Sequence, residues 1–436
     1  PQKCDDGIFS KTNISLPAMG VDCKGYNGKS TYVWKRKSTE YLYKIVTNTG
    51  NEIVVSPTHP MFVTENSIVT SRKSEDLKER DFIACPRSLK LDTKLQKINF
   101  DIVRTTAHNG IHINIPKICD IELARLIGYL ISDSYVAFTK TSGEATFTNK
   151  DYDLLDDYDY LVRRLGVTPK FTGSRNSIKR LRVNSIEFLR FFNKIEPTLL
   201  KRSKHKQIPD IIKKSPNFVV KEFIKSYYDA ESNVQNNKRE IKVSSASKDL
   251  IYDLRSLLLR FNILSQTHKT IGCATNTIAK TRRPYWTLMI SGKDIVKYSS
   301  KIGFTSTAKK RKLDLLLNNK CYNPDIDVIP NLFYVLRKIR TKLRLKQSEL
   351  GVPRTTYQHY ERGDRNPSRG SLRKILDTAY KRISYLNYVL ANQKFSSLKQ
   401  ARETLYLSQS SLAESAQCSQ TLISQYELGA NSIQQN

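Results

Sequence analysis

The chain has 436 residues, with 73 Lys and Arg against 41 Asp and Glu, so its formal charge is +32 and its isoelectric point is about 9.8. Hydrophobic residues make up 39% of the chain, which is enough to build cores and excludes a disordered basic tail. A length of this order allows about two to four domains. The positive charge favours a polyanionic partner, nucleic acid ahead of an anionic membrane.

Cysteine usage and hydropathy indicate an intracellular protein. The seven cysteines are scattered and form no Cys-x-x-Cys pair, so neither a zinc site nor a disulfide framework is indicated. Residues 1–25 lack the apolar run of a secretion signal. The longest apolar stretch, 126–138, is interrupted by Ser132, Asp133 and Ser134. We therefore expect a cytoplasmic protein without a membrane span.

Short alternating runs fill the chain before Leu91. The clearest are 30–34, 42–47 and 52–55, and Asn-Gly and Thr-Gly dipeptides lie between them. This pattern is typical of antiparallel strands joined by tight turns. We expect an all-β domain over residues 1–115.

Two apolar helical stretches in the middle of the chain repeat each other. Residues 126–134 end in Asp133-Ser and residues 224–232 end in Glu231-Ser, so the two acids are 98 residues apart. A Lys-Asp pair lies downstream of each acid, at 150–151 and at 248–249, and the two pairs are also 98 residues apart. Each pair opens a second amphipathic helix. A tandem duplication of an α-β-β-α unit explains both landmarks. It predicts an α+β domain over about 200 residues, 116–315.

In the strand-like stretches between these helices, basic and polar residues occupy alternate positions and would therefore share one face of each strand. Two such sheets side by side would form a long cationic surface, which a DNA duplex needs for phosphate neutralisation and contacts to base edges. The alternative is a set of solvated outer faces, but the charge excess recurs in corresponding strands of both repeats. The candidate DNA contacts are Arg175, Lys179, Arg180 and Arg182 in the first repeat and Lys280, Arg282 and Arg283 in the second.

The repeated acids suggest a metal site. If the two helices pack about a pseudo-two-fold axis, Asp133 and Glu231 meet at the bottom of the seam between them. Two carboxylates there would bind a divalent cation such as Mg2+, which takes oxygen ligands and leaves positions for water and phosphate oxygens. Such sites hydrolyse phosphodiesters. The alternative is that each residue is a solvated acid that ends its helix.

Residues 126–134 and 224–232 resemble the two signature helices of the LAGLIDADG homing endonucleases. The resemblance implies a monomeric endonuclease that cuts double-stranded DNA at a long asymmetric site, has the αββαββα fold twice, and uses Asp133 and Glu231 as ligands of Mg2+ or another divalent cation. The alternative function is a catalytically decayed, non-enzymatic DNA-binding protein. A freestanding transcriptional regulator would need an effector site or a dimer interface in place of the paired acids.

Several positions depart from the family pattern. The closing Gly of the signature is Ser134 in the first copy and Ser232 in the second, and the Gly within the seam is Gly128 in the first copy but Ser226 in the second. Because Ser is small enough for close helix packing, we expect the fold to survive these changes.

Residues 204–209, Lys-His-Lys-Gln-Ile-Pro, resemble the lysine-Ile-Pro segment of intein-borne members of that family. The resemblance implies that Lys206 assists the attacking water or stabilises the transition-state charge. The alternative is a phosphate-contacting lysine in a basic run.

Residues 54–63 form a strand-like run with a Ser-x-x-His motif at Ser56 and His59. The motif resembles that of intein splicing domains, usually Thr-x-x-His, within the Hint fold. The resemblance implies that His59 promotes the acyl shift at the first peptide bond, with Ser56 as its hydrogen-bonding helper. A structural histidine in a β domain is the alternative.

The two ends of the chain depart from the intein pattern. An intein begins with Cys or Ser and ends in His-Asn, whereas this chain begins Pro1-Gln-Lys-Cys4 and ends Ser432-Ile-Gln-Gln-Asn436. We expect an internal piece of an intein that does not splice by itself. Its partners in the full precursor would be the exteins of a host protein.

After the Asn-Pro break at 323–324 the pattern is helical, most clearly over 332–343, 371–388 and 410–428. A second duplication lies in this block, 325–436. The first copy has a Gln at 347 followed by Tyr-Glu at 360–361, and the second has a Gln at 409 followed by Tyr-Glu at 426–427. Both copies resemble the helix-turn-helix of Cro/repressor-type DNA-binding domains. The Gln-to-Tyr interval is 13 residues in the first copy and 17 in the second. Four residues are about one helical turn, so the shorter copy keeps its faces in phase.

The first copy carries the candidate DNA-reading helix. The residues expected to face the major groove are Arg354, Thr355, Thr356, Gln358 and His359. The second copy has Ser419, Gln420 and Ser424 in that position and no cation, which leaves it open between a structural role and DNA binding. Residues 357–369 resemble a stretch in inteins of archaeal replicative helicases of the MCM type, which suggests such a host.

Overall fold

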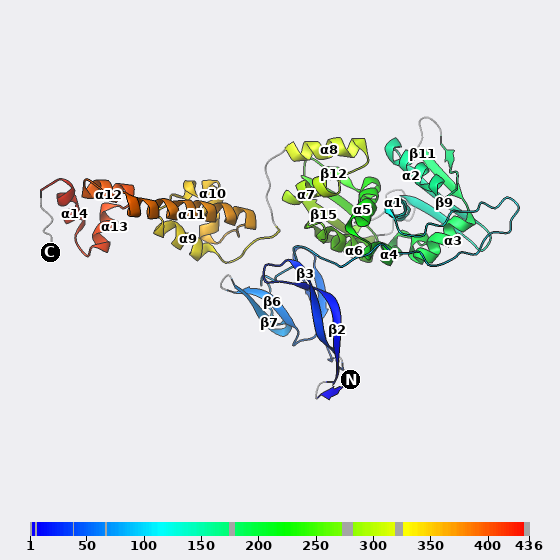
Figure 1. Cartoon of the computed structure of the whole chain (residues 1–436), viewed down its shortest axis with the longest axis horizontal. Coiled ribbons are helices and arrows are strands. Elements are labelled where there is room, and N and C mark those ends of the chain that lie inside the picture. The colour runs from blue at the N-terminus through cyan, green and yellow to red at the C-terminus, as the bar shows by residue number, and fades with distance from the viewer. Residues whose placement is uncertain are drawn as a thin grey trace. The chain divides into compact units, whose positions relative to one another are not determined.

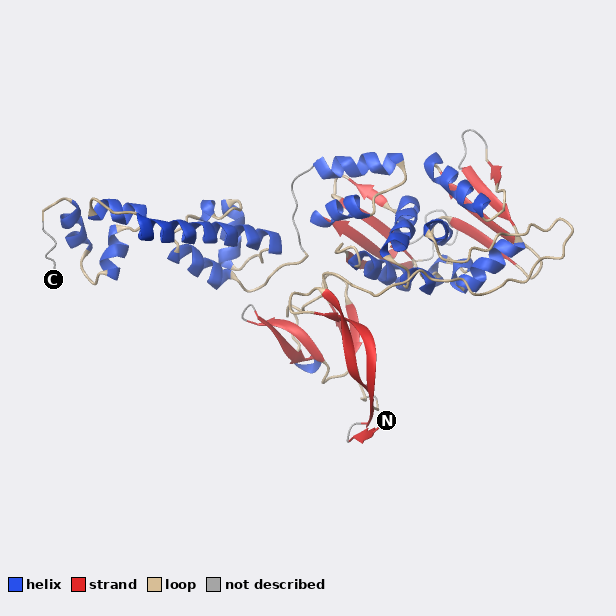
Figure 2. Cartoon of the chain, viewed as in Figure 1, coloured by secondary structure: helices blue, strands red, loops and turns tan. Residues whose placement is uncertain are grey.

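The computed structural model describes residues 2–4, 7–37, 39–65, 68–173, 179–272, 282–318 and 326–430. The chain divides into two compact units, one made of residues 1–62 and 71–324 and the other of residues 63–70 and 325–436. The N-terminal region is made mainly of strands, the middle of strands and helices, and the C-terminal region of helices (Figures 1 and 2). No helix within the described ranges is long and apolar enough to cross a membrane.

The N-terminal region consists of three small antiparallel sheets. Their strands are β1 (Gln2–Cys4), β2 (Gly7–Met19) and β3 (Gly25–Lys35) in one sheet, β4 (Tyr43–Val46) with β5 (Glu52–Val55), and β6 (Pro60–Glu65) with β7 (Ile68–Lys73). The predicted strands are therefore present. Large apolar side chains on β2 and β3 are exposed, however, and among the described residues neither hydrophobic cluster includes one before Ile98. The region is made of small sheets, and the all-β domain expected over residues 1–115 stays a prediction.

The turn between β4 and β5 contacts the middle region. The Gly50 carbonyl accepts a hydrogen bond from the Tyr252 hydroxyl (3.0 Å), and Glu52 pairs with Lys248 (2.6 Å). Gly50 has a φ of +78°, and a Cβ there would lie 2.0 Å from the Thr267 carbonyl oxygen. The Thr-Gly signal in the sequence is therefore required both by the turn and by this close approach.

The middle region contains the αββαββα order twice. The first repeat comprises α1 (Ile121–Ile131), β8 (Ser134–Phe138), β9 (Gly143–Asn149), α2 (Tyr152–Arg164), β10 (Lys170–Thr172), β11 (Lys179–Asn184) and α3 (Ile186–Ile195). The second comprises α5 (Asn217–Glu231), β12 (Asn233–Gln235), β13 (Glu240–Ser245), α6 (Lys248–Leu259), β14 (Gln266–Gly272), β15 (Arg283–Ser291) and α7 (Lys293–Lys301). The sheets have the equivalent strand orders β8-β9-β11-β10 and β12-β13-β15-β14. The predicted duplication is present.

One hydrophobic core joins the two repeats. Helices α1 and α5 lie side by side between the two sheets (Figure 1), and their apolar residues belong to the same buried cluster as those of the flanking helices and strands. Short segments connect the parts: η1 (Ser74–Asp76), η2 (Pro197–Leu200), η3 (Ser203–His205), α4 (Asp210–Lys213) and α8 (Thr307–Asn318).

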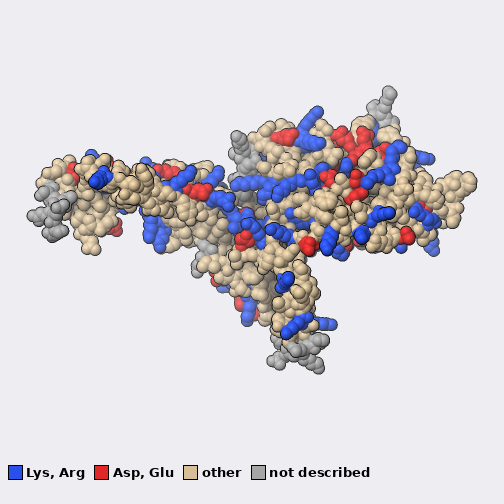
Figure 3. Space-filling view, viewed as in Figure 1, with Lys and Arg blue, Asp and Glu red and all other residues tan. Residues whose placement is uncertain are grey.

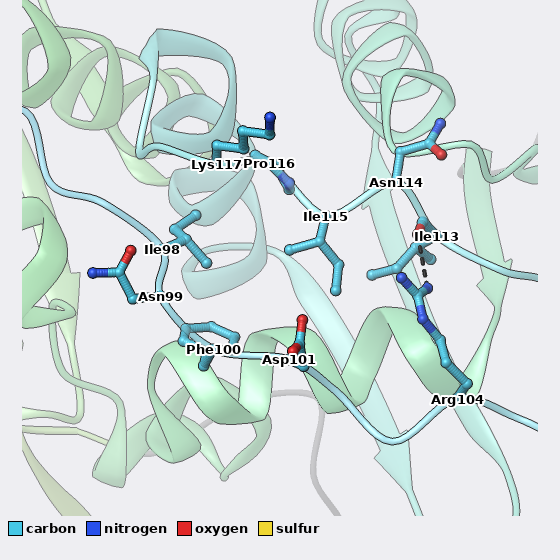
Figure 4. A pocket seen from close by; sticks show the side chains of 10 residues that line it. All are labelled: Ile98, Asn99, Phe100, Asp101, Arg104, Ile113, Asn114, Ile115, Pro116 and Lys117. Carbon is cyan, nitrogen blue, oxygen red and sulfur yellow. Dashed lines mark hydrogen bonds between the residues drawn. The ribbon is translucent and has the colours of Figure 1, made fainter.

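The segment that leads into the first repeat forms an open pocket. Its stretches 98–104 and 113–117 run beside each other, and the Arg104 guanidinium donates a hydrogen bond to the Ile113 carbonyl at 2.9 Å (Figure 4). None of the predicted site residues lines this pocket.

Glu187, at the start of α3, holds this segment in place. Its buried carboxylate accepts hydrogen bonds from the backbone N–H of Thr105 (2.8 Å) and of Ile113 (3.2 Å) and from Arg104 (2.8 Å), and it contacts His112 Nδ1 (2.9 Å). Burial alone would raise the pKa of Glu187, but these donors outweigh it and lower the pKa to about 2.

Replacing Glu187 with Gln is expected to lower the free energy of unfolding by about 3 kcal/mol at pH 7. A carboxylate with a lowered folded pKa stabilises fully above its unfolded pKa, and this stabilisation is lost as the pH falls through about 2. Urea denaturation of the wild type and the variant should therefore show that the difference between their free energies of unfolding is about half as large at pH 3 as at pH 7. Glu144→Gln, at a half-buried carboxylate, is the control, and an equal loss at both pH values would contradict this account.

The C-terminal region contains two helical units joined by a long helix. Its elements are α9 (Phe333–Lys342), η4 (Gln347–Glu349), α10 (Arg354–Arg362), α11 (Arg369–Asn392), α12 (Leu398–Thr404), α13 (Gln409–Ser415) and α14 (Gln420–Glu427). The stretch 410–428, predicted as one helical segment, is two helices. Gln417 has a φ of 53° and Ser419 caps the next helix, so the chain turns between them.

Candidate active site

Helices α1 and α5 pack closely where the sequence places its small residues. A Cβ on Gly128 would lie 2.0 Å from Ser226 Oγ and 2.9 Å from the Phe223 carbonyl oxygen. Ser226 directs its hydroxyl to that same carbonyl at 3.1 Å and is buried. Gly at one position and Ser at the other therefore let the helices approach, as the sequence predicted.

Gly128→Ala is expected to destabilise the chain by about 1–3 kcal/mol, because the new methyl group forces the two helices apart. The second change Ser226→Gly removes one of the two clashing groups, so the double variant should recover part of the loss. A double-mutant cycle on unfolding free energies measures this coupling. Strict additivity of the two changes would show that these positions do not limit the helix spacing.

The structure brings the two predicted acids together at the ends of α1 and α5. Asn149 Nδ2 donates a hydrogen bond to Asp133 at 3.2 Å. Desolvation by the surrounding protein raises the pKa of Asp133, and the same desolvation, reinforced by the charge of Asp133, raises that of Glu231 to about 7. In the described part of the chain no group of three or more His, Cys, Asp or Glu is placed to hold a metal ion, so the acids form a pair.

Lys206 lies against the end of α1. Its ammonium group is buried and donates hydrogen bonds to the carbonyl oxygens of Leu130 (3.0 Å) and Ile131 (2.6 Å). Helix carbonyls at a C-terminus lack partners within the helix and carry partial negative charge, so an ammonium group is suited to this place. Burial lowers the pKa of Lys206 to about 8, against the opposing charges of Glu231 and Asp133.

A second lysine, for which the sequence motifs gave no prediction, occupies the matching place on α5. Lys309 Nζ donates hydrogen bonds to the carbonyl oxygens of Tyr228 (3.1 Å), Asp229 (2.6 Å) and Ser232 (2.7 Å). Burial lowers its pKa to about 8. The sequence carries no signal that singles it out, because Lys309 follows Glu231 by 78 residues whereas Lys206 follows Asp133 by 73, so the interval is not repeated.

Asp229 holds the segment that carries Lys309. Its buried carboxylate accepts hydrogen bonds from the backbone N–H of Thr305 (2.8 Å) and Ser306 (3.1 Å), just before α8 begins. Burial raises the pKa of Asp229 to about 6, although these donors oppose the rise. The site therefore has two carboxylates and two ammonium groups, one of each per repeat, an arrangement able to bind a cation and a phosphate together.

The strands place some of the predicted DNA contacts on one face. In β11, Arg180 and Arg182 are exposed while Leu181 and Val183 are buried, which is the predicted alternation. Lys179 departs from the prediction: it belongs to the opposite side of the strand, and its Nζ lies 3.3 Å from the centre of the Tyr152 ring.

In the second sheet Arg282 and Arg283 are exposed at the start of β15. Arg175 and Lys280 lie outside the described residues. On the face drawn in Figure 3, basic side chains are spread over both repeats and acidic ones gather over α2.

The Ser-x-x-His motif has a different partner from the one predicted. Ser56 Oγ accepts a hydrogen bond from the Arg36 guanidinium (3.1 Å), which also reaches Thr58 Oγ1 (3.4 Å). His59 contributes its backbone, donating to the Ser56 carbonyl and accepting from the N–H of Ser74. Ser56 is therefore held by Arg36, which was not identified from the sequence, and the splicing roles of Ser56 and His59 stay predictions.

The predicted reading helix is α10. Arg354 and Thr355 are exposed at its start, and Thr356, Gln358 and His359 are partly exposed. Tyr357 and Tyr360, between them, are buried in the hydrophobic cluster of this unit. His359 Nδ1 lies 3.3 Å from Asp364, so one ring nitrogen is already engaged.

Two family models match the chain. The LAGLIDADG-like domain matches residues 120–196 and 218–303, and the helix-turn-helix matches residues 336–378. These are the regions in which the structure has its two repeats and its first C-terminal unit. The predictions of both families from sequence motifs are confirmed.

Similar proteins include the replication factor C small subunit of Methanocaldococcus jannaschii, 27% identical over 78% of this chain and 16% of that protein. An A-type ATP synthase subunit of Pyrococcus abyssi is 30% identical over 54% of this chain and 23% of that protein. The probable translation initiation factor IF-2 of M. jannaschii is 24% identical over 84% and 35%. This chain thus spans 16 to 35% of the length of these relatives.

Among solved structures, the homing endonuclease I-DmoI in complex with DNA and Ca is 18% identical, covering 44% of this chain and 96% of that one, with a TM-score of 0.33. The homing endonuclease I-WcaI bound to its DNA recognition sequence is 16% identical over 47% and 87%, also with a TM-score of 0.33. The family matches show that this chain contains a LAGLIDADG-like domain followed by a helix-turn-helix domain.

Proposed function

We propose that this chain is the intein-borne endonuclease of a longer protein and makes a site-specific double-strand break in DNA. The observation that carries the proposal is the four-residue site at the ends of α1 and α5, made of Asp133, Glu231, Lys206 and Lys309. Each repeat supplies one acid and one lysine. One half of the site would therefore act on each DNA strand.

The two acids fit a divalent cation, and Mg2+ is the one we expect. Their pKa values are raised by the surrounding protein and, at Glu231, by the charge of Asp133, and a cation near both acids would oppose this rise. Mg2+ is commonly held by one or two carboxylates together with waters and phosphate oxygens. When bound, such a cation supplies an activated water and neutralises the charge of the phosphate.

Lys206 would act on the reacting phosphate. An ammonium group has three N–H donors, and in the described structure Lys206 gives two of them to carbonyls of α1. The third is available to the attacking water or to a phosphate oxygen, where a positive charge stabilises the transition state. Near neutral pH a pKa of about 8 keeps the lysine mostly protonated.

DNA would lie across the two sheets. Arg180, Arg182 and Arg283 are exposed on their strands and suited to phosphate contacts, while polar neighbours read base edges. Because the two repeats differ in sequence, a monomer of this chain would recognise an asymmetric site.

The relatives support the intein assignment. Their names describe unrelated activities, yet each matches this chain over a small part of its own length, as expected of an element inserted into different hosts. We further propose that His59 and Ser56 act in splicing, with Arg36 holding Ser56 in place. The proposed host is an archaeal replicative helicase of the MCM type, whose exteins flank the full intein.

A cleavage assay tests the endonuclease proposal. The chain is incubated with a plasmid library of randomised and host-derived sites, with Mg2+ and with EDTA, and the ends of linear product are sequenced. Linear product with Mg2+ alone is expected, and its sequence identifies the target. Retention of DNA without cleavage in every metal tested would instead establish a decayed, non-enzymatic DNA-binding protein.

A further inference from the structure

The second C-terminal unit, 398–430, repeats the side-chain network of the first unit, 332–363. In the first unit Glu361 accepts hydrogen bonds from Arg340 (2.6 Å) and from Gln347 (2.7 Å). The corresponding donors to Glu427 in the second unit are Arg402 (3.0 Å) and Gln409 (2.8 Å). The helix-turn-helix family match ends at residue 378, so nothing assigns a role to this second unit.

The backbone of the two units agrees as well. Arg344 and Tyr406, 62 residues apart, both have left-handed conformations, with φ of 53° and 55°. Gly363 and Gly429 end the reading helices at φ of 80° and 75°. The four-residue difference lies in one helix, because the three-residue η4 of the first unit replaces the seven-residue α13. The second unit is therefore a complete helix-turn-helix.

The two units touch through equivalent positions. Arg344 Nη1 donates a hydrogen bond to the carbonyl oxygen of its equivalent, Tyr406, at 3.5 Å. Arg382, from the middle of α11, donates to the Leu343 carbonyl (3.4 Å) and stacks its guanidinium 3.7 Å from the Tyr406 ring. A two-fold axis between the units would bring equivalent positions into contact in this way.

The second unit presents side chains that read bases. Gln420 and Thr421 are exposed at the start of α14 and Ser424 is partly exposed one turn later, while Ile423 is buried beneath them. Gln makes bidentate hydrogen bonds to adenine, and Ser or Thr bonds to several bases. The residues around this helix supply little phosphate attraction. Residues 393–430 contain three Lys and Arg and three Asp and Glu, whereas residues 329–378 contain twelve and four.

We propose that the C-terminal region is a single-chain pseudo-dimer that binds two half-sites of double-stranded DNA in inverted orientation. The first unit supplies phosphate attraction and reads one half-site with α10. The second unit reads the other half-site with Gln420, Thr421 and Ser424 of α14. Two-fold-related helix-turn-helix units meet inverted half-sites, and the sequence difference between α10 and α14 makes the two half-sites unequal.

The test uses the full chain carrying Asp133→Asn and Glu231→Gln, so that the DNA stays intact. DNA bound by this protein is selected from a random duplex library and mapped by hydroxyl-radical footprinting. Gln420→Ala with Ser424→Ala should erase one protected patch and weaken binding by about tenfold to a hundredfold. Arg354→Ala should erase a second patch, centred about one helical turn of DNA, or a multiple of it, from the first and on the same face of the duplex. Gln393→Ala, at an exposed glutamine of the linker, is the matched control and should leave both patches.

Three results would overturn the proposal. If the double change in α14 leaves every patch intact while the circular-dichroism melt is unchanged, the second unit is structural. If the centres of the two patches are not separated by about one helical turn or a multiple of it, the two-fold arrangement is wrong. If neither helix variant alters the footprint, the C-terminal region does not read DNA. None of these results bears on cleavage, which the wild-type chain with Mg2+ tests separately.

Discussion

Replacing Asp133 with Asn or Glu231 with Gln is expected to reduce DNA cleavage by on the order of a thousandfold or more while DNA binding persists. Each change removes a carboxylate that the proposed site uses to hold a divalent cation. The proposed DNA-binding surface lies on the cationic strands, which these changes leave untouched. Plasmid linearisation measures the first quantity and a gel-shift titration in Ca2+ the second.

The same variants distinguish a functional pair from acids that merely end their helices. The folded pKa of Glu231 is raised to about 7, so the folded state binds its proton more tightly than the unfolded state does. The wild type therefore loses stability as the pH rises from about 4.5 to about 7. In EDTA at pH 8, the free energy of unfolding of Glu231→Gln should exceed that of the wild type by about 1–2 kcal/mol. Near pH 4 the two free energies should be equal. A variant that loses stability at pH 8 would contradict this prediction.

Lys206→Met and Lys309→Met are expected to have different effects, although the two lysines occupy matching places. Lys206 gives two hydrogen bonds to helix carbonyls and has a donor left, so its loss should slow cleavage by about 100- to 1000-fold. Lys309 gives its donors to three carbonyls, so its loss should cost about 2–4 kcal/mol of stability and affect cleavage less directly. Nicked plasmid should accumulate with Lys206→Met if each half of the site serves one strand.

Lys204→Met and Lys310→Met are the matched controls, because both side chains are exposed and lie close in sequence to Lys206 and Lys309. Neither should alter cleavage or unfolding beyond a small loss of DNA affinity. Stability against pH gives a second measurement. A lysine with a lowered folded pKa favours the neutral form, so the wild type should gain stability as the pH rises from about 8 to about 10.5. Over this pH range the stability of each Met variant should rise less than that of the wild type. A rise as large as that of the wild type in both variants would contradict the lowered pKa values of the two lysines.

The repeats could be predicted because they leave a periodic trace in the sequence. The acids at 133 and 231 keep one interval with their downstream Lys-Asp pairs, and the apolar periodicity of each stretch specifies its helix. The structure contains the predicted αββαββα order twice. The N-terminal strands were predictable for the same reason, but their assembly was not, since alternation indicates a strand and leaves its partners undetermined.

Site residues divide in a similar way. Asp133, Glu231 and Lys206 stand in motifs with recognisable neighbours, and the structure brings all three together. Lys309 stands in a basic run with no such motif, and only the buried carboxylate of Asp229 and the end of α5 distinguish it from the lysines beside it. Lys179 shows the opposite case. It follows the predicted basic pattern but points toward Tyr152 on the other side of the strand.

By itself, the sequence determined the charge, the two duplications, the acids and the small residues of the helix seam, because each is a local pattern or a fixed interval along the chain. Only the tertiary structure decided which groups meet. It placed Lys309 beside Glu231, Arg36 on Ser56, and Arg344 against its own equivalent, Tyr406. These contacts depend on how helices and strands pack, and packing is set by shape and burial across residues far apart in the chain.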